Sequence, residues 1–136
     1  SIEPLAFVAA AVPHLKRAGG GRIVFVTSAG PLQGIPGFGA YAAARSAITG
    51  AVKSLALELA PERISVNAAA LNYIQTEMYY PKAWLEDARK REKLLARIPM
   101  GRLGDPAEAA EVIALLAEGR ASFVTGQILN ISGGSS

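Results

Sequence analysis

Three short segments, separated by helical patterns, constrain the fold of this chain more than any other feature. They lie at residues 22–28, 64–70 and 127–131. The first is too short and too rich in β-branched residues to favour a helix, and its unbroken apolar character is typical of a parallel strand buried on both faces. Strands that alternate with helices predict an α/β fold with a parallel sheet.

Helical patterns surround the predicted strands. Apolar residues recur at helical spacing over residues 4–18 and 41–60, and a charge-rich helical stretch covers residues 82–97. A further helix is predicted over residues 105–118, because Asp105 is a favourable amino-terminal cap and a proline follows it at the first helical position. The glycine directly after this helix is expected to close it.

Three parallel strands make up only part of a doubly wound sheet, which normally has about six strands in two halves. No G-x-G-x-x-G turn follows a strand in this sequence, so these residues lack the usual phosphate-binding turn of a dinucleotide fold. We therefore expect residues 1–136 to form a single partial Rossmann-like domain. It would be the carboxyl-terminal half of a doubly wound parallel sheet, with the amino-terminal half absent from this chain.

Composition excludes several classes of function. Hydrophobic residues make up 51% of the chain and charged residues 18%, which predicts a packed core rather than disorder. The net charge is only +3 and the basic residues are scattered, so we expect no nucleic-acid partner. The sequence has no cysteine and one histidine, too few ligands for zinc, so we expect no metal site. The absence of cysteine favours a reducing compartment, so we expect a cytoplasmic protein. No apolar segment reaches the roughly 20 residues that a membrane span needs, so we expect no membrane partner.

The candidate catalytic residues are Ser28, Tyr41 and Arg45. Ser28 ends the first predicted strand, at the carboxyl edge where open α/β sheets bind their ligands. Tyr41 and Arg45 are four residues apart and share one face of the predicted helix. A tyrosine is a poor base at neutral pH, but a permanent positive charge within about 4–6 Å favours the phenolate. We therefore expect Tyr41 to act as a base, with Arg45 supplying the charge and Ser28 binding a substrate oxygen.

Each of these residues also has a purely structural interpretation. Ser28 could be an ordinary strand-end serine, Tyr41 a packed aromatic and Arg45 a solvated helix residue. The catalytic hypothesis depends on the three occurring together, as a strand-end serine followed at a distance of thirteen residues by Tyr-x-x-x-Arg.

This combination resembles the short-chain dehydrogenase/reductase superfamily. The similar stretches cover nearly the whole chain and lie at residues 27–29, 39–47, 55–59, 64–68, 101–108 and 125–134. The resemblance implies a Rossmann-type fold, a catalytic triad of serine, tyrosine and a basic residue, and assembly into a homo-oligomer, a dimer or tetramer.

Two departures from the superfamily pattern narrow the resemblance. Arg45 stands where the superfamily usually has lysine, and Leu71-Asn72 stands where it usually has Pro-Gly. Both departures resemble the halohydrin dehalogenases, relatives that keep the triad without a nicotinamide cofactor. The resemblance implies that the following residues bind halide and substrate: Leu71, Asn72, Tyr73, Ile74, Tyr79, Tyr80 and Trp84.

The implied reaction converts a vicinal halohydrin to an epoxide and a halide ion, or opens an epoxide with a small anion in reverse, and needs no cofactor. Backbone amides around Tyr73 and Ile74, together with positive aromatic ring edges, would bind the departing halide. Tyr79, Tyr80 and Trp84 have an alternative interpretation as residues that fix a helical flap to the core.

Two other functions stay open from the sequence. One is an oxidoreductase that uses NAD or NADP, in which Arg45 merely replaces the usual lysine and also contacts the cofactor ribose. The other is a non-catalytic subunit or fragment whose role is assembly. Outside the proposed site, we expect Asn67 to hold a loop by hydrogen bonds and His14 to lie on the surface near a helix end.

Overall fold

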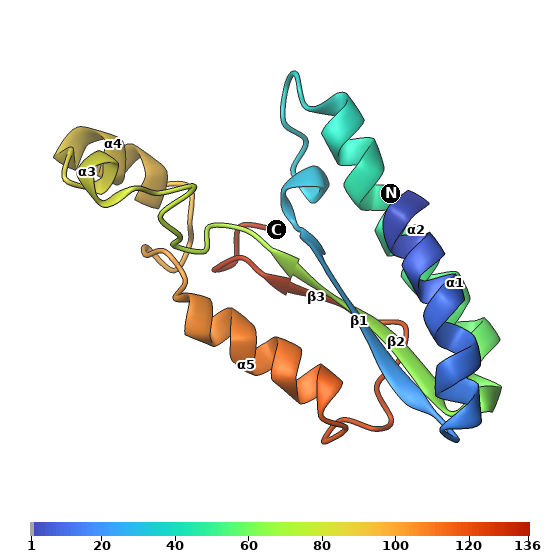
Figure 1. Ribbon diagram of the computed structural model, residues 1–136. Helices are drawn as coiled ribbons and strands as arrows, with labels where there is room; N and C mark the ends of the chain where they lie inside the picture. Colours follow the sequence, from blue (N-terminus) through green and yellow to red (C-terminus); the bar gives the residue numbers. More distant parts are fainter. Residues whose placement is uncertain (1) are drawn as a thin grey trace.

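The structure is a computed structural model that describes residues 2–136, apart from the side chains of residues 2 and 32. Its centre is a parallel sheet with the strand order β1-β2-β3 (Figure 1). The strands are β1 (Gly21–Ser28), β2 (Ile64–Leu71) and β3 (Ile128–Ile131). All three predicted strands are present to within one residue at each end, and the predicted α/β class with a parallel sheet is confirmed.

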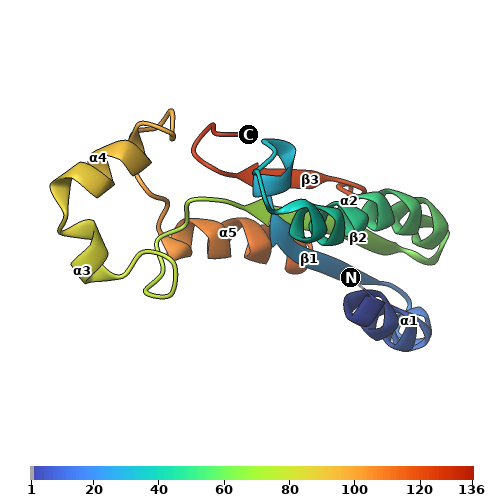
Figure 2. The same cartoon turned by 90° about the horizontal axis from the view of Figure 1, so that it is seen from above.

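Helices cover both faces of the sheet. The helices α1 (Ile2–Arg17) and α2 (Gly39–Leu59) lie on one face, and α5 (Pro106–Ala117) lies on the other (Figures 1 and 2). Two short helices, α3 (Lys82–Leu85) and α4 (Ala88–Leu95), extend beyond the carboxyl ends of the strands. Short 3-10 turns follow β1 (η1, Gly30–Leu32) and α2 (η2, Ala60–Glu62).

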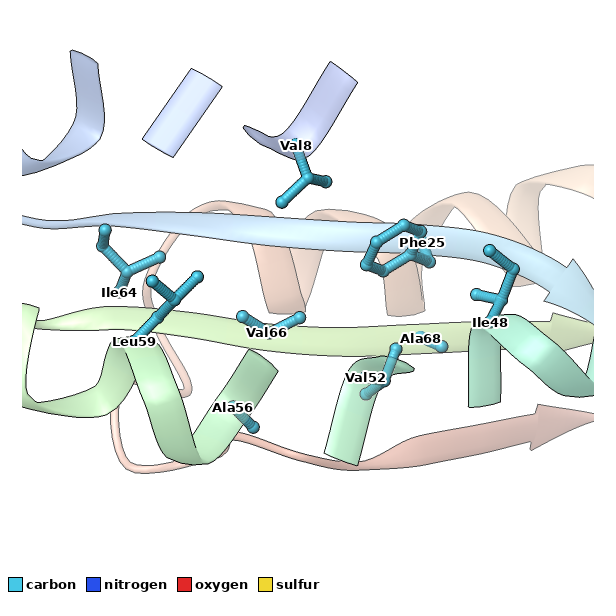
Figure 3. Close-up of a cluster of buried hydrophobic side chains, with 9 residues drawn as sticks. All are labelled: Val8, Phe25, Ile48, Val52, Ala56, Leu59, Ile64, Val66 and Ala68. Atoms are coloured by element: carbon cyan, nitrogen blue, oxygen red, sulfur yellow. The ribbon is translucent and has the colours of Figure 1, made fainter. Parts of the chain in front are cut away.

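The hydrophobic core lies between β2 and the α1–α2 layer (Figure 3). Val66 on β2 and Val52 on α2 are both fully buried. Phe25 of β1 and Val8 of α1 extend this cluster to the first helix. Because β2 is the central strand, its side chains are almost all buried, and it fixes the position of both neighbouring strands.

Asn67 joins the central strand to the segment that leads into β3. Its side chain is 1% exposed, its Nδ2 donates to Val124 O at 2.9 Å, and its Oδ1 accepts the Gln127 N–H at 3.0 Å. The expectation that Asn67 holds a loop by hydrogen bonds is confirmed.

The single charge-rich helix predicted over residues 82–97 is wrong, because the chain breaks it into α3 and α4 at Asp87. Asp87 has an extended backbone (φ −70°, ψ 100°), and its side chain accepts the N–H groups of Arg89 and Lys90. An aspartate that caps a new helix competes with continuation of the previous one. These hydrogen bonds, with the charge of Lys90, hold the pKa of the Asp87 carboxyl below its usual value.

The expectation that the first strand is buried on both faces is wrong in part. Phe25, which faces α1 and α2, is buried, but Val26 on the opposite face is 52% exposed. The reason is that β1 is an edge strand of the sheet formed by residues 2–136, so it has a strand neighbour on one side alone.

Both ends of α5 follow the predicted pattern. Asp105 and Glu108 form a capping box at its start, and Gly119 after its end adopts φ +85°, a backbone conformation that favours glycine. The Arg22 guanidinium lies where a Cβ at Gly119 would be, but this flexible side chain could move, so the backbone conformation is what favours glycine here.

Candidate active site

The carboxyl ends of the three strands meet in register, and the candidate site is built around them. Ser28 of β1 pairs with Leu71 of β2, and Leu71 pairs with Ile131 of β3. The chain leaves the sheet at this edge, which is where open α/β folds bind ligands. The Ser28 Oγ accepts the Gly30 N–H at 3.2 Å. This bond uses Ser28 as an acceptor and leaves its hydroxyl proton available to a ligand.

Tyr41 lies in the first turn of α2, and Arg45 lies one turn later on the same face. The Arg45 Cζ is 5.3 Å from the centroid of the Tyr41 ring, a cation–π arrangement. Phe38 packs its ring edge-on against Tyr41, with 6.1 Å between the ring centroids. Helical spacing therefore places a permanent positive charge directly over the tyrosine, as the sequence predicts.

A cavity of about 290 Å³ connects this pair to the loop that follows β2. Its lining includes all three candidate catalytic residues and six of the seven predicted halide and substrate residues. The lining residues are Val26, Thr27, Ser28, Tyr41, Arg45, Leu71, Asn72, Tyr73, Ile74, Thr76, Tyr79 and Tyr80. The cavity thus brings together residues from β1, α2, β2 and the segment before α3.

Trp84 is the predicted residue that does not line the cavity. It packs on Tyr80, with 6.1 Å between the ring centroids and 53° between the ring planes. Tyr79 and Tyr80 line the cavity, and Trp84 supports Tyr80 from α3. Tyr79 and Tyr80 therefore agree with the interpretation as pocket residues, and Trp84 agrees with the interpretation as a packing residue.

Sequence reasoning missed three lining residues, namely Val26, Thr27 and Thr76. Val26 and Thr27 directly precede Ser28, so their place at the strand end was a usable signal. The Thr27 hydroxyl is buried and has no hydrogen-bond partner within residues 2–136. Thr76 carried no such signal, because it lies in an irregular segment beyond β2.

The phenol of Tyr80 differs electrostatically from an ordinary surface tyrosine. Burial, and to a smaller extent the neighbouring Tyr73, raise the pKa of Tyr80 above its usual value. Its hydroxyl therefore stays protonated at neutral pH and can donate a hydrogen bond. This makes Tyr80 a donor in the cavity rather than a base.

The loop after β2 has an unusual backbone. The Asn72 N–H continues the sheet by donating to Ile131 O at 3.0 Å, and Tyr73 then turns into the left-handed region with φ +54°. The Tyr73 N–H donates to the Asn72 Oδ1 at 3.0 Å. The Tyr73 amide is therefore already hydrogen-bonded. Of the two amides expected to bind halide, only that of Ile74 still needs to be considered.

Ile74 retains a free amide. It forms an isolated parallel bridge with Gly104, in which Gly104 N–H donates to Tyr73 O at 3.0 Å and Gln75 N–H donates to Gly104 O at 2.8 Å. Such a bridge uses the polar groups of the residues on either side of Ile74 and leaves its own N–H directed away from Gly104. No hydrogen bond made by residues 2–136 involves the Ile74 N–H.

The part of the chain that the structure describes contains no group of three or more His, Cys, Asp or Glu side chains arranged to hold a metal ion. None of its helices is both long and apolar enough to cross a membrane.

Comparison with protein families gives one match over almost the whole chain. Residues 3–136 match the family described as enoyl-(acyl carrier protein) reductase. The 3-oxoacyl-[acyl-carrier-protein] reductase FabG of Thermotoga maritima is 42% identical over 123 residues, which are 90% of this chain and 48% of that protein. Dehydrogenase/reductase SDR family member 4 of Oryctolagus cuniculus is 36% identical over 126 residues, covering 93% and 48% respectively. The chain spans about half the length of the curated relatives it matches.

Comparison with solved structures gives a neighbour of a different kind. A structure described as "Dehalogenation enzyme" superimposes with a TM-score of 0.89 and 39% sequence identity. The match covers 100% of this chain and 56% of that one. The similarity therefore includes every element that lines the cavity.

Proposed function

The chain belongs to the short-chain dehydrogenase/reductase superfamily, and we propose that within it the protein is a halohydrin dehalogenase that needs no nicotinamide cofactor. The observation that carries this proposal is the cavity that combines Tyr41 under the Arg45 guanidinium with the Asn72–Ile74 loop. The 39% identity to a structure described as a dehalogenation enzyme supports it. The volume of about 290 Å³ suits a small substrate.

Ring closure follows from the placement of the three catalytic candidates. Tyr41, as the phenolate, takes the hydroxyl proton of the substrate, and the resulting alkoxide attacks the adjacent carbon. The new carbon–oxygen bond forms as the carbon–halogen bond breaks, and the halide leaves with the bonding electron pair. The Arg45 guanidinium lies over the Tyr41 ring and holds a positive charge beside the base, and the free hydroxyl proton of Ser28 binds the substrate oxygen. Tyr41 then releases its proton to solvent.

The halide needs a set of donors at the opposite end of the substrate. The unused Ile74 N–H is one donor, and the protonated Tyr80 hydroxyl is a second. Ring edges of Tyr73 and Tyr79 add positive electrostatic potential without a full charge. In reverse, Tyr41 acts as the acid while a small anion at this end opens an epoxide.

The residues at the end of β2 support a reaction without a nicotinamide dinucleotide. Leu71-Asn72 stands where the superfamily pattern has Pro-Gly, and the large side chain of Tyr73 follows directly and lines the cavity. No step of the proposed reaction therefore uses the cofactor.

The second candidate is an oxidoreductase that uses NAD or NADP. It is favoured by the names of the similar sequences, because FabG and SDR family member 4 are both named as reductases. A serine, a tyrosine and a basic residue would serve both reactions, so the triad alone does not separate them. The two candidates differ in their products.

We expect the protein, expressed from its native reading frame, to release bromide from 2-bromoethanol without added nicotinamide. The reason is that the proposed base, oxygen donor and halide donors all lie in one cavity. Bromide is measured by ion chromatography, and absorbance of reduced nicotinamide is followed in parallel with alcohol and ketone substrates. If absorbance changes require NAD or NADP and no bromide is released, the oxidoreductase function would replace the proposed dehalogenase function.

We also expect a homo-oligomer, a dimer or tetramer, formed through α1 and α2. A largely apolar groove of about 620 Å³ runs between these helices, and small residues such as Ala9, Ala51 and Ser54 line it. Phe7 and Leu57 on the same two helices are 76% and 80% exposed. Sedimentation velocity should give at least a dimer at micromolar concentration, and a monomer at all concentrations would contradict this assembly.

A further inference from the structure

We infer that Arg102 and Glu108 are positioning residues for the anion: they hold Gly104, and through it the Ile74 amide that the proposed function assigns to the halide. This inference rests on the proposed function. Neither side chain lines the reaction cavity, and both line a separate cavity of about 90 Å³ that shares the Asn72–Ile74 loop with the reaction cavity.

The first step is that the loop depends on Gly104. Between Tyr73 and Gln75, the backbone hydrogen bonds that reach beyond the loop both go to Gly104, at 3.0 and 2.8 Å. A Cβ at Gly104 would lie 2.8 Å from the Ile74 Cδ1, so the two residues are also in close contact. The direction of the Ile74 N–H therefore follows the position of the Gly104 backbone.

The second step is that an ion pair fixes the peptide groups on both sides of Gly104. Arg102 Nη1 donates to Leu103 O at 3.1 Å, which holds the peptide before Gly104. Glu108 Oε2 accepts the Asp105 N–H at 2.8 Å, which holds the peptide after it. Arg102 and Glu108 are joined by two hydrogen bonds of 2.7 and 2.6 Å. The pair thus clamps Gly104 from both directions.

The third step is that stability alone does not account for this arrangement. The side chains of Arg102 and Glu108 are 55% and 47% exposed, and exposed ion pairs contribute little to folding. Two parallel hydrogen bonds from a guanidinium do fix geometry, which a single flexible ammonium does not. The hydrogen bonds from Arg102 and from the Asp105 backbone lower the pKa of Glu108 to about 2, so the pair stays ionised at neutral pH.

We expect Arg102→Met to raise the dissociation constant for bromide by roughly tenfold, because the Ile74 donor loses its fixed direction. Glu108→Gln should have a smaller effect, since glutamine still caps the Asp105 N–H. Arg102→Lys should restore part of the affinity. Bromide binding is measured by calorimetry, apart from turnover. Catalysis by Tyr41 should keep its pH profile in all three variants, because its surroundings do not change.

Arg120→Met is the matched control, because Arg120 forms a comparably exposed ion pair with Glu118 at the other end of α5. It should leave bromide affinity unchanged. The positioning role would be overturned if Arg102→Met bound bromide with native affinity. The proposed function would still stand in that case, provided that the unmutated protein releases bromide. If bromide affinity and turnover both fall in Arg102→Met together with the melting temperature, the pair has a structural role. That result would also overturn the positioning role. An unmutated protein that neither binds nor releases bromide would overturn both.

Discussion

Tyr41→Phe is expected to lower the rate of halide release by roughly 10²–10⁴-fold, the usual contribution of a positioned general base. The substitution removes a phenol that lies under a guanidinium, at 5.3 Å from Arg45 Cζ to the ring centroid. It keeps the ring, the contact with Phe38 and the cation–π arrangement. Tyr80 cannot substitute for the lost base, because burial raises the pKa of its hydroxyl. Halide release is measured with 2-bromoethanol under saturating conditions.

Two controls separate a lost base from a damaged site. Ser46→Ala removes an exposed hydroxyl from the next turn of α2 and should leave halide release unchanged. The Tyr41→Phe protein itself should bind bromide with native affinity, because the Ile74 amide lies on a different element. Halide release that survives in Tyr41→Phe would remove the proposed mechanism altogether.

The parts of the molecule that could be predicted from the sequence depend on local geometry. Ser28 and Leu71 end parallel strands, and parallel strands that start at the same edge also end together, so their proximity follows from the strand pattern. Tyr41 and Arg45 meet because residues four apart share a helix face. These two rules are sufficient to bring the catalytic candidates together from the sequence.

The parts that could not be predicted depend on contacts between distant residues or on competition within a segment. Ile74 pairs with Gly104 in an isolated bridge that lies outside the named strands. No periodic pattern in the sequence therefore predicts this contact. Asp87 divides a charge-rich helix because its side chain captures two backbone amides, a choice that charge patterning does not reveal. Trp84 lies on the short helix α3 and packs on Tyr80 without lining the cavity, a distinction that the sequence pattern does not mark.

Asn67→Ala is expected to destabilise the protein by about 2–6 kcal/mol, because it leaves two partly buried backbone groups without partners, at about 1–3 kcal/mol each. Those groups are Val124 C=O and Gln127 N–H, now bonded to Asn67 at 2.9 and 3.0 Å. The side chain is 1% exposed, so water cannot replace it without opening the sheet between β2 and β3. The free energy of unfolding is measured by urea denaturation.

Asn130→Ala on β3, which removes an exposed asparagine side chain, is the control and should change the free energy of unfolding by less than about 0.5 kcal/mol. Because Asn67 lies outside the reaction cavity, halide release per folded molecule should stay native, and a loss of activity without a loss of stability would assign Asn67 to the site instead.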